Sequence, residues 1–131
     1  MIEQLKAGDG LYRVRGVNLA TGRLWARPIA DKSRLAEPMS GVPVARVGSR
    51  DGTWVFTLYR GGKHGPFVHA LNVAGGLAAC LDLRGDHSSR PDDGSWTLKL
   101  AASQKLLRAV NPASGEAVSI AMIDGWPQIA G

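Results

Sequence analysis

Apolar and polar residues alternate with a period of two along most of this chain, and Gly-, Asn- or Asp-containing turns separate the alternating runs. Such runs predict strands joined as antiparallel hairpins. The predicted strands are Tyr12–Asn18, Arg23–Ile29, Val42–Val47, Thr53–Tyr59, Phe67–Val73, Leu77–Leu83, Trp96–Leu100, Leu106–Val110 and Ala117–Ile123. The pattern therefore predicts an all-β protein.

One short motif occurs three times: an apolar residue, Asn, three variable residues and Gly, at Asn18–Gly22, Asn72–Gly76 and Asn111–Gly115. An Asn side chain hydrogen-bonds the backbone of a turn, and a Gly four positions later can take a positive φ. A longer match aligns Asp51–Leu58 with Asp93–Leu100, about 40 residues further along the chain. A period of this length with several strands per unit is typical of propeller blades.

We therefore predict one β domain over residues 1–131 with about two and a half propeller-like antiparallel blades. Its parts are a partial blade at 11–30, a linker at 31–41, blades at 42–84 and 85–124, and a tail at 125–131. The first strand of the last blade would have to come from Asp86–Pro91, which has the composition of a loop. Closed propellers have roughly four to eight blades, so this number does not close a ring alone. A small β-sandwich or barrel built from the same hairpins is the alternative.

The alternation also predicts which side chains form the core. One face of each central strand is apolar, and large residues on it are expected to be buried. These are Trp54, Phe56, Leu58, Val68, Leu71, Leu81, Leu83, Trp96, Leu98, Leu107, Val110 and Ile120.

The segment from Asp51 to Leu83 resembles a repeat of uncharacterised actinobacterial proteins that are predicted to form β-propellers. The resemblance lies in Trp54, Thr57–Tyr59, Pro66–Leu71 and Cys80–Leu83. It covers about a quarter of the chain well and a further third loosely. Asn72 departs from the propeller pattern, which more often has Asp there. The resemblance implies a propeller-like fold and an extracytoplasmic domain of a longer, membrane-linked chain, and it transfers no catalytic residue.

Composition narrows the classes of protein. Hydrophobic residues make up 44% and charged residues 21% of the 131 residues, as in ordinary globular domains. A single cysteine, Cys80, excludes an internal disulfide and any multi-cysteine metal site. The chain has no apolar run that would cross a bilayer, and Met1–Gln4 lacks the features of a signal peptide. We expect no direct membrane insertion, and a cytoplasmic location is the alternative to the extracytoplasmic one.

The net charge of +5 is concentrated in the first half of the chain, where residues 1–65 hold eleven Lys/Arg and five Asp/Glu. Clustered cations bind polyanions, whereas scattered ones usually form a solvated face. A Gly-rich turn with two basic side chains is a further candidate for anion contacts. The candidate binding residues are Arg13, Arg15, Arg23 and Arg27 on the first hairpin and Lys63 and His64 in the Gly61–Gly65 turn.

No motif in the sequence assembles a catalytic centre. His69 and Cys80 lie on neighbouring predicted strands, but a Cys/His pair without an orienting third group gives neither an activated nucleophile nor a metal site. The acidic stretch from Asp82 to Asp93 lacks the ligand spacing of a calcium loop. We expect no catalytic residues, no metal and no cofactor.

The incomplete set of blades suggests a function. Uncovered strand edges and sheet faces need a partner. We expect a non-enzymatic interaction or assembly module that binds protein, either further copies of itself or the remainder of a larger propeller. The expected interface is Leu11–Ile29 at one end and Ala117–Ile129 at the other, with Ile120→Lys or Met122→Lys as disrupting changes. The alternatives are a weak nucleic-acid or polyanion binder and a propeller enzyme of the lactonase or hydrolase type.

Overall fold

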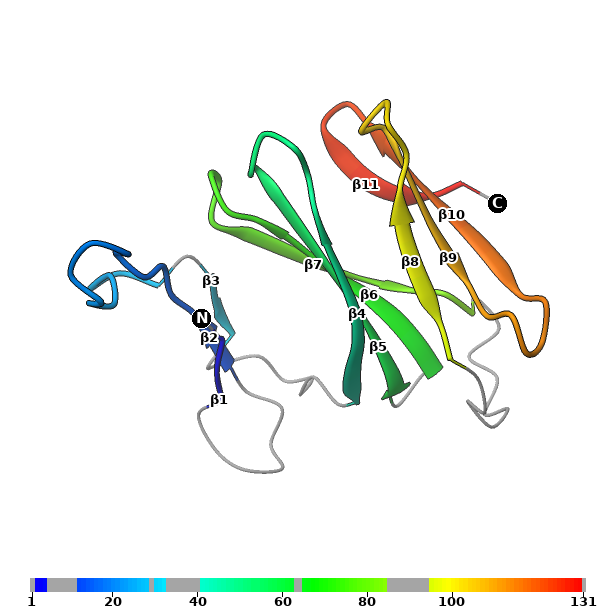
Figure 1. Cartoon of the computed structure of the whole chain (residues 1–131), viewed down its shortest axis with the longest axis horizontal. Coiled ribbons are helices and arrows are strands. Elements are labelled where there is room, and N and C mark those ends of the chain that lie inside the picture. Colours follow the sequence, from blue (N-terminus) through cyan, green and yellow to red (C-terminus); the bar gives the residue numbers. More distant parts are fainter. Residues whose placement is uncertain are drawn as a thin grey trace.

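The computed structural model describes residues 2–4, 12–28, 30–32, 41–62, 65–84 and 95–130. Within these ranges the regular structure consists of β-strands, which form three antiparallel sheets in the order of the chain. Figure 1 shows the small N-terminal sheet, a middle sheet and a C-terminal sheet side by side. The prediction of an all-β fold is confirmed.

The N-terminal sheet differs most from the prediction. It consists of β1 (Ile2–Gln4), β2 (Tyr12–Val14) and β3 (Ala30–Lys32), with β2 in the centre. No strand was predicted at β1, and most of β3 lies in the predicted linker. The hairpin predicted between residues 12 and 29 keeps only an isolated bridge between Val17 and Leu24 outside this sheet.

Two local features mark this hairpin. The Trp25 ring lies so close to Gly16 that a Cβ at Gly16 would be 2.5 Å from it. Pro28 has no backbone N–H to donate to a neighbouring strand. The alternation of apolar residues continued through both positions and therefore predicted longer strands.

The middle sheet is a four-stranded meander of β4 (Val42–Gly48), β5 (Trp54–Gly62), β6 (Gly65–Asn72) and β7 (Leu77–Asp82). The C-terminal sheet repeats this topology with β8 (Thr97–Leu100), β9 (Leu106–Val110), β10 (Ala117–Ile123) and β11 (Trp126–Ile129). Each of the seven strands predicted after residue 41 is present, with ends shifted by at most a few residues.

Strand β11 occupies residues that the sequence assigned to a tail. It pairs with β10 through a two-residue turn in which Asp124 and Gly125 both have positive φ values, of 51° and 75°. This turn geometry matches the twist of a hairpin, and Asp-Gly is one of its preferred sequences. The fourth strand of the C-terminal sheet is therefore β11. The segment Asp86–Pro91, which was considered as the first strand of the last blade, lies outside the described residues.

The main core lies between the middle and C-terminal sheets. β4 lies against β8 and β7 lies against β11, so the two meanders stack in the same strand order (Figure 1). Most of the predicted core is confirmed, while Leu81, Leu98 and Val110 are only partly buried. The buried core residues are Trp54, Phe56, Leu58, Val68, Ala70, Leu83, Trp96, Leu107, Ala109 and Ile120.

A smaller apolar contact joins the N-terminal sheet to the opposite face of the middle sheet. Val14 of β2 is buried together with Leu71 of β6, and Val55, Val73 and Ala78 pack around them. The middle sheet is therefore packed on both faces, by the C-terminal sheet on one side and by β2 on the other.

The recurring Asn motif forms the same turn three times. The backbone N–H groups of Gly22, Gly76 and Gly115 donate to the carbonyl oxygens of Asn18, Asn72 and Asn111 at 2.7, 3.0 and 2.9 Å. The φ values of the three glycines are 68°, 66° and 76°. Each Asn Oδ1 also accepts a backbone N–H within the turn. The predicted role of the motif is confirmed in every copy.

The longer sequence repeat corresponds to three strands, because it aligns β5, β6 and β7 with β8, β9 and β10. Phe56 and Leu58 face the core from β5, and their counterparts Leu98 and Leu100 face it from β8. The equivalent apolar faces of the two sheets thus meet across the core, as they do in a β-sandwich. Each sheet is also a four-stranded meander that follows the previous one along the chain, as a propeller blade does. The structure is therefore consistent with both predicted folds.

Candidate functional site

The outer face of the C-terminal sheet, on the side away from the core, is a sheet surface that no described residue covers. Strand register places Thr97, Val110 and Ala117 in one row across it. Lys99, Arg108 and Ser119 form the next row. Leu106 follows beyond them and is 39% exposed. We call this surface the β8–β10 outer face.

The equivalent face of the middle sheet shows what such a surface looks like when it is covered. In the repeat, Thr97, Val110 and Ala117 correspond to Val55, Leu71 and Ala78, the row on which Val14 packs. Leu71 is buried beneath Val14, whereas its counterpart Val110 is only partly buried. The equivalent outer face is therefore covered in the middle sheet, and no described residue covers it in the C-terminal sheet.

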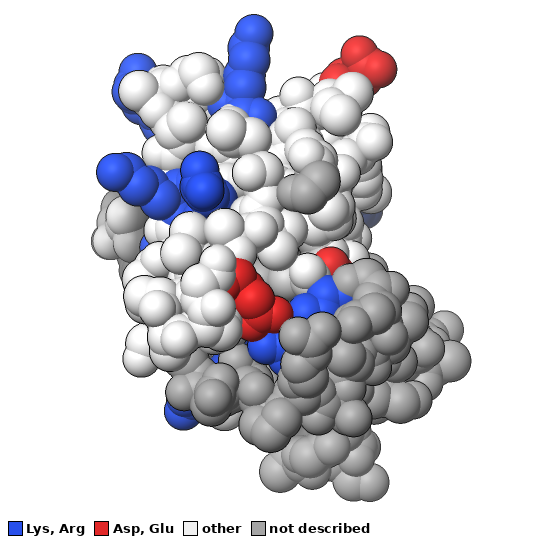
Figure 2. Space-filling model, turned by 90° about the vertical axis from the view of Figure 1, so that its right-hand side faces the viewer, with Lys and Arg blue, Asp and Glu red and all other residues white. Residues whose placement is uncertain are grey.

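Figure 2 views the molecule from the side of the C-terminal sheet. Uncharged atoms make up most of the described surface in this view, and Lys and Arg side chains project along one side of it. Asp and Glu side chains also lie near the centre of this view and at its upper edge, so the uncharged area is bordered by charges of both signs.

A second exposed apolar cluster lies at the other end of the molecule, on the hairpin of residues 12–28. Trp25 is 51% exposed and Leu24 is 39% exposed, and Val17 and Leu19 are exposed beside them. We call these four residues the hairpin cluster. Val17 and Leu24 are bridge partners on one side of the hairpin, and Trp25 lies over Gly16 on the other side. Exposed large apolar side chains are typical of surfaces that bind another molecule.

The candidate cations have different environments. Arg15 donates from Nη1 to the carbonyl oxygens of Trp25 and Ala26, at 3.2 Å each, and so connects the two arms of the hairpin. Arg23 and Arg27 are exposed on the same hairpin. Arg13 lies on β2, with its side chain outside the described part. Lys63 and His64 lie outside the described residues.

His69 and Cys80 are neighbours, as their strands predicted. They are paired across β6 and β7, and His69 is also paired with Thr57 of β5. His69 is 2% exposed, whereas Cys80 is exposed. His69 lies on the face of the middle sheet that the N-terminal hairpin faces.

Arg46 is a basic residue that the sequence analysis missed. It lies on β4 and donates from Nε to Oγ1 of Thr57 at 3.2 Å. Burial raises the pKa of nearby Tyr59, and the positive charge of Arg46 opposes that rise. A signal was present in the sequence, because Arg46 is the one charged residue in the apolar run Val42–Val47.

The described residues contain no group of three or more His, Cys, Asp or Glu side chains placed to hold a metal ion. No described helix is long and apolar enough to cross a bilayer. Comparisons of the chain with protein-family models, with curated proteins and with solved structures find no match.

Proposed function

We propose that this protein is a non-enzymatic assembly module that associates with copies of itself, the β8–β10 outer face of one copy binding the hairpin cluster of the next. The observation that supports it most is the unequal covering of two equivalent sheet faces. Val14 covers the outer face of the middle sheet, and no described residue covers the corresponding face of the C-terminal sheet.

The proposed contact joins two different surfaces, so it is head-to-tail. Pairing two β8–β10 outer faces would bring together two rows that each hold Lys99 and Arg108, whereas the hairpin cluster supplies four exposed large apolar side chains. The hairpin cluster offers Trp25, a large aromatic side chain of the kind enriched at binding surfaces. A head-to-tail contact continues the stacking of sheets already present within the chain.

Salt should strengthen this association. Both surfaces carry cations, Lys99 and Arg108 on one and Arg23 and Arg27 on the other. Their repulsion over distances near the Debye length falls as salt rises, because that length shrinks from about 10 Å at 0.1 M to about 3 Å at 1 M. The apolar contact itself does not depend on screening.

Light scattering coupled to size exclusion tests the proposal over a range of protein and salt concentrations. We expect masses above the 13.9 kDa of one chain that increase with both concentrations. Leu106→Lys should abolish the increase because it places a charge on the β8–β10 outer face. Leu77→Lys is the control, since Leu77 is 53% exposed on β7 of the middle sheet. A single mass of one chain under all conditions contradicts the proposal.

Lysine at Ile120 or Met122 is expected to destabilise the protein as well as dissociate it, so these two positions do not isolate the interface. Ile120 is fully buried in the core between the two sheets, and Met122 packs against that core. A lysine at either position would destabilise the fold itself. Substitutions on the outer face avoid this ambiguity.

A second candidate function is weak binding of single-stranded nucleic acid by the hairpin cluster. It is favoured by the exposure of Trp25 between two exposed arginines, Arg23 and Arg27. Aromatic rings stack on bases, and cations contact phosphates. Titration with a fluorescent oligothymidylate should then show binding that weakens as salt rises, the opposite of the self-association. Loss of that binding in Trp25→Ala would support this candidate, and absence of binding at low salt would exclude it.

A further inference from the structure

A hollow of about 690 Å³ lies between the N-terminal hairpin and the outer face of the middle sheet. Its apolar wall consists of Val14 from the hairpin and Val55, Leu71 and Val73 from the sheet region. This volume falls within the range of roughly 300–1,000 Å³ that is usual for small-molecule sites.

The remaining wall of the hollow is basic and polar. Arg15 contributes to it from the hairpin, and Arg46, Thr57 and His69 contribute from β4, β5 and β6. No Asp or Glu side chain is among the described residues that line it. The hollow thus combines two guanidinium groups and an imidazole with an aliphatic surface.

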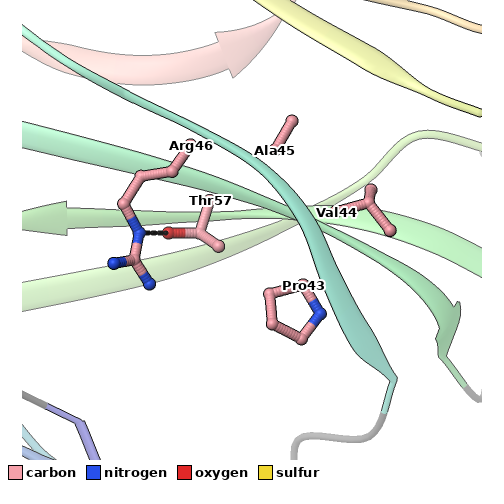
Figure 3. Close-up of a pocket in the computed structure, with 5 residues that line it drawn as sticks. All are labelled: Pro43, Val44, Ala45, Arg46 and Thr57. Carbon is pink, nitrogen blue, oxygen red and sulfur yellow. Dashed lines mark hydrogen bonds between the residues drawn. The ribbon is translucent and has the colours of Figure 1, made fainter.

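Arg46 is positioned to bind an anion. Its Nε is fixed on the sheet by the hydrogen bond to Thr57 Oγ1, and both side chains project from the same side of the sheet in Figure 3. No described residue accepts a hydrogen bond from its two terminal nitrogens. A guanidinium held at one edge presents its remaining N–H groups to a carboxylate in a planar arrangement.

His69 adds a buried imidazole to the wall of the hollow, whereas Arg46 is exposed. His69 is 2% exposed and lies in the row between Thr57 and Cys80. Because Thr57 is paired with both Arg46 and His69, the three residues form one continuous basic and polar stretch of the wall.

We propose that this hollow binds a small organic carboxylate with a short aliphatic chain. The carboxylate contacts the terminal nitrogens of Arg46 beside His69, and the chain packs against Val55, Leu71 and Val73. Charge selects the head of the ligand, and the aliphatic wall selects its tail. This inference concerns the inner side of the hairpin and is independent of the proposed self-association.

Three probes separate the contributions of charge and apolar contact: hexanoate, inorganic phosphate and hexanol. Binding is followed by amide chemical shifts in ¹⁵N-labelled protein, in the Leu106→Lys background so that self-association does not interfere. We expect hexanoate to bind at least about tenfold more tightly than phosphate or hexanol, since only hexanoate has both the charge-assisted hydrogen bonds and the apolar tail. Equal affinities for hexanoate and phosphate overturn the proposal, and so does equal binding of hexanol.

Variants of Arg46 test its role directly. Arg46→Gln should weaken hexanoate binding by about tenfold or more, and Arg46→Lys should weaken it less because the charge remains without the planar fork. Arg108→Gln is the matched control, because Arg108 occupies the position equivalent to His69 on the open β8–β10 outer face. Unchanged affinity in Arg46→Gln, or an equal loss in Arg108→Gln, contradicts the proposal. Arg46→Lys supplies the decisive measurement if Arg46→Gln does not fold.

Discussion

Asn111 is fully buried, although it occupies the same turn position as the partly exposed Asn72. Its Oδ1 accepts the Ala113 N–H at 3.0 Å, and its Nδ2 has no hydrogen-bond partner among the described residues. Burying an unpaired amide donor carries a desolvation cost. The turn at Asn111 therefore carries a desolvation free-energy cost that the turn at the partly exposed Asn72 does not.

This difference predicts opposite tolerance of the same substitution. Asn72→Asp should change the free energy of unfolding by less than about 0.5 kcal/mol, because the new carboxylate still accepts the turn hydrogen bond at a partly exposed site. Asn111→Asp should cost about 3 kcal/mol or more at neutral pH, because it buries a charge on the same turn as Glu116. Urea unfolding measures both values. Equal costs would show that burial at residue 111 has no energetic effect.

The two core tryptophans provide a second test at the residue scale. Trp54 and Trp96 occupy equivalent positions in the repeat, and both are buried in the same core. Replacing either by Ala should cost about 3–5 kcal/mol, since each leaves a large cavity. Thermal unfolding of the two variants is the measurement. A loss below about 1 kcal/mol in only one of them would contradict the equivalence of the two strands.

Among the elements, the β4–β5 hairpin is stabilised by its acidic turn residue. Asp51 Oδ1 accepts hydrogen bonds from Ser49 Oγ at 2.6 Å and from the Thr53 N–H at 2.9 Å. These bonds, that from Ser49 first, lower the pKa of Asp51 below its ordinary value of 3.8.

Because the folded pKa is the lower one, this stabilisation is present above the unfolded pKa and is lost as pH falls through the folded pKa. An NMR titration of the Asp51 carboxyl should give a pKa below 3.8. Ser49→Ala should move it back towards that value, since it removes the main cause. An unshifted pKa in the unmodified chain would contradict the turn geometry.

Sequence periodicity predicted the strands of the middle and C-terminal sheets because both sheets have one apolar face and well-marked turns. It failed at β3 and β11 for different reasons. β11 contains Pro127 and is only four residues long, so it has too little alternation to be recognised. β3 has the sequence Ala-Asp-Lys and shows no apolar alternation. It is a strand because it pairs with β2, and that pairing joins residues that are far apart in the sequence.

The candidate binding sites were less predictable than the fold. The hairpin arginines were found by their charge, but the position of Arg15 against the carbonyl groups of Trp25 and Ala26 depends on how the hairpin folds back on itself. Arg46 and His69 line the same hollow only because β4, β5 and β6 pair and the hairpin faces them. No spacing in the sequence encodes that proximity.

At the scale of the whole molecule, an ion pair links the two large sheets. Arg84, just after β7, donates from Nε and Nη2 to the two carboxylate oxygens of Glu116 at 2.9 and 2.8 Å. Arg84 is buried, and Glu116 is partly exposed and also accepts a bond from Ser114 Oγ. Removing the Glu116 carboxylate takes these two charge-assisted hydrogen bonds from the buried Arg84 guanidinium.

Glu116→Gln should therefore destabilise the protein by about 2–3 kcal/mol, somewhat less than a fully buried pair because Glu116 reaches solvent. The double variant Arg84→Met with Glu116→Gln should recover part of that loss, since it also removes the buried guanidinium charge. Urea unfolding of the single and double variants measures the coupling. A single variant as stable as the unmodified chain would mean that the ion pair does not hold the sheets together.

The central claim is that two different surfaces of this chain bind each other, and mixing two variants tests it most directly. Leu106→Lys disables the β8–β10 outer face, and Leu24→Lys disables the hairpin cluster. Light scattering should show each variant alone as a single chain of 13.9 kDa. An equimolar mixture should form a dimer of one copy of each, because each variant retains the surface that the other lacks. A mixture that remains monomeric, while the unmodified protein associates, would contradict the head-to-tail contact.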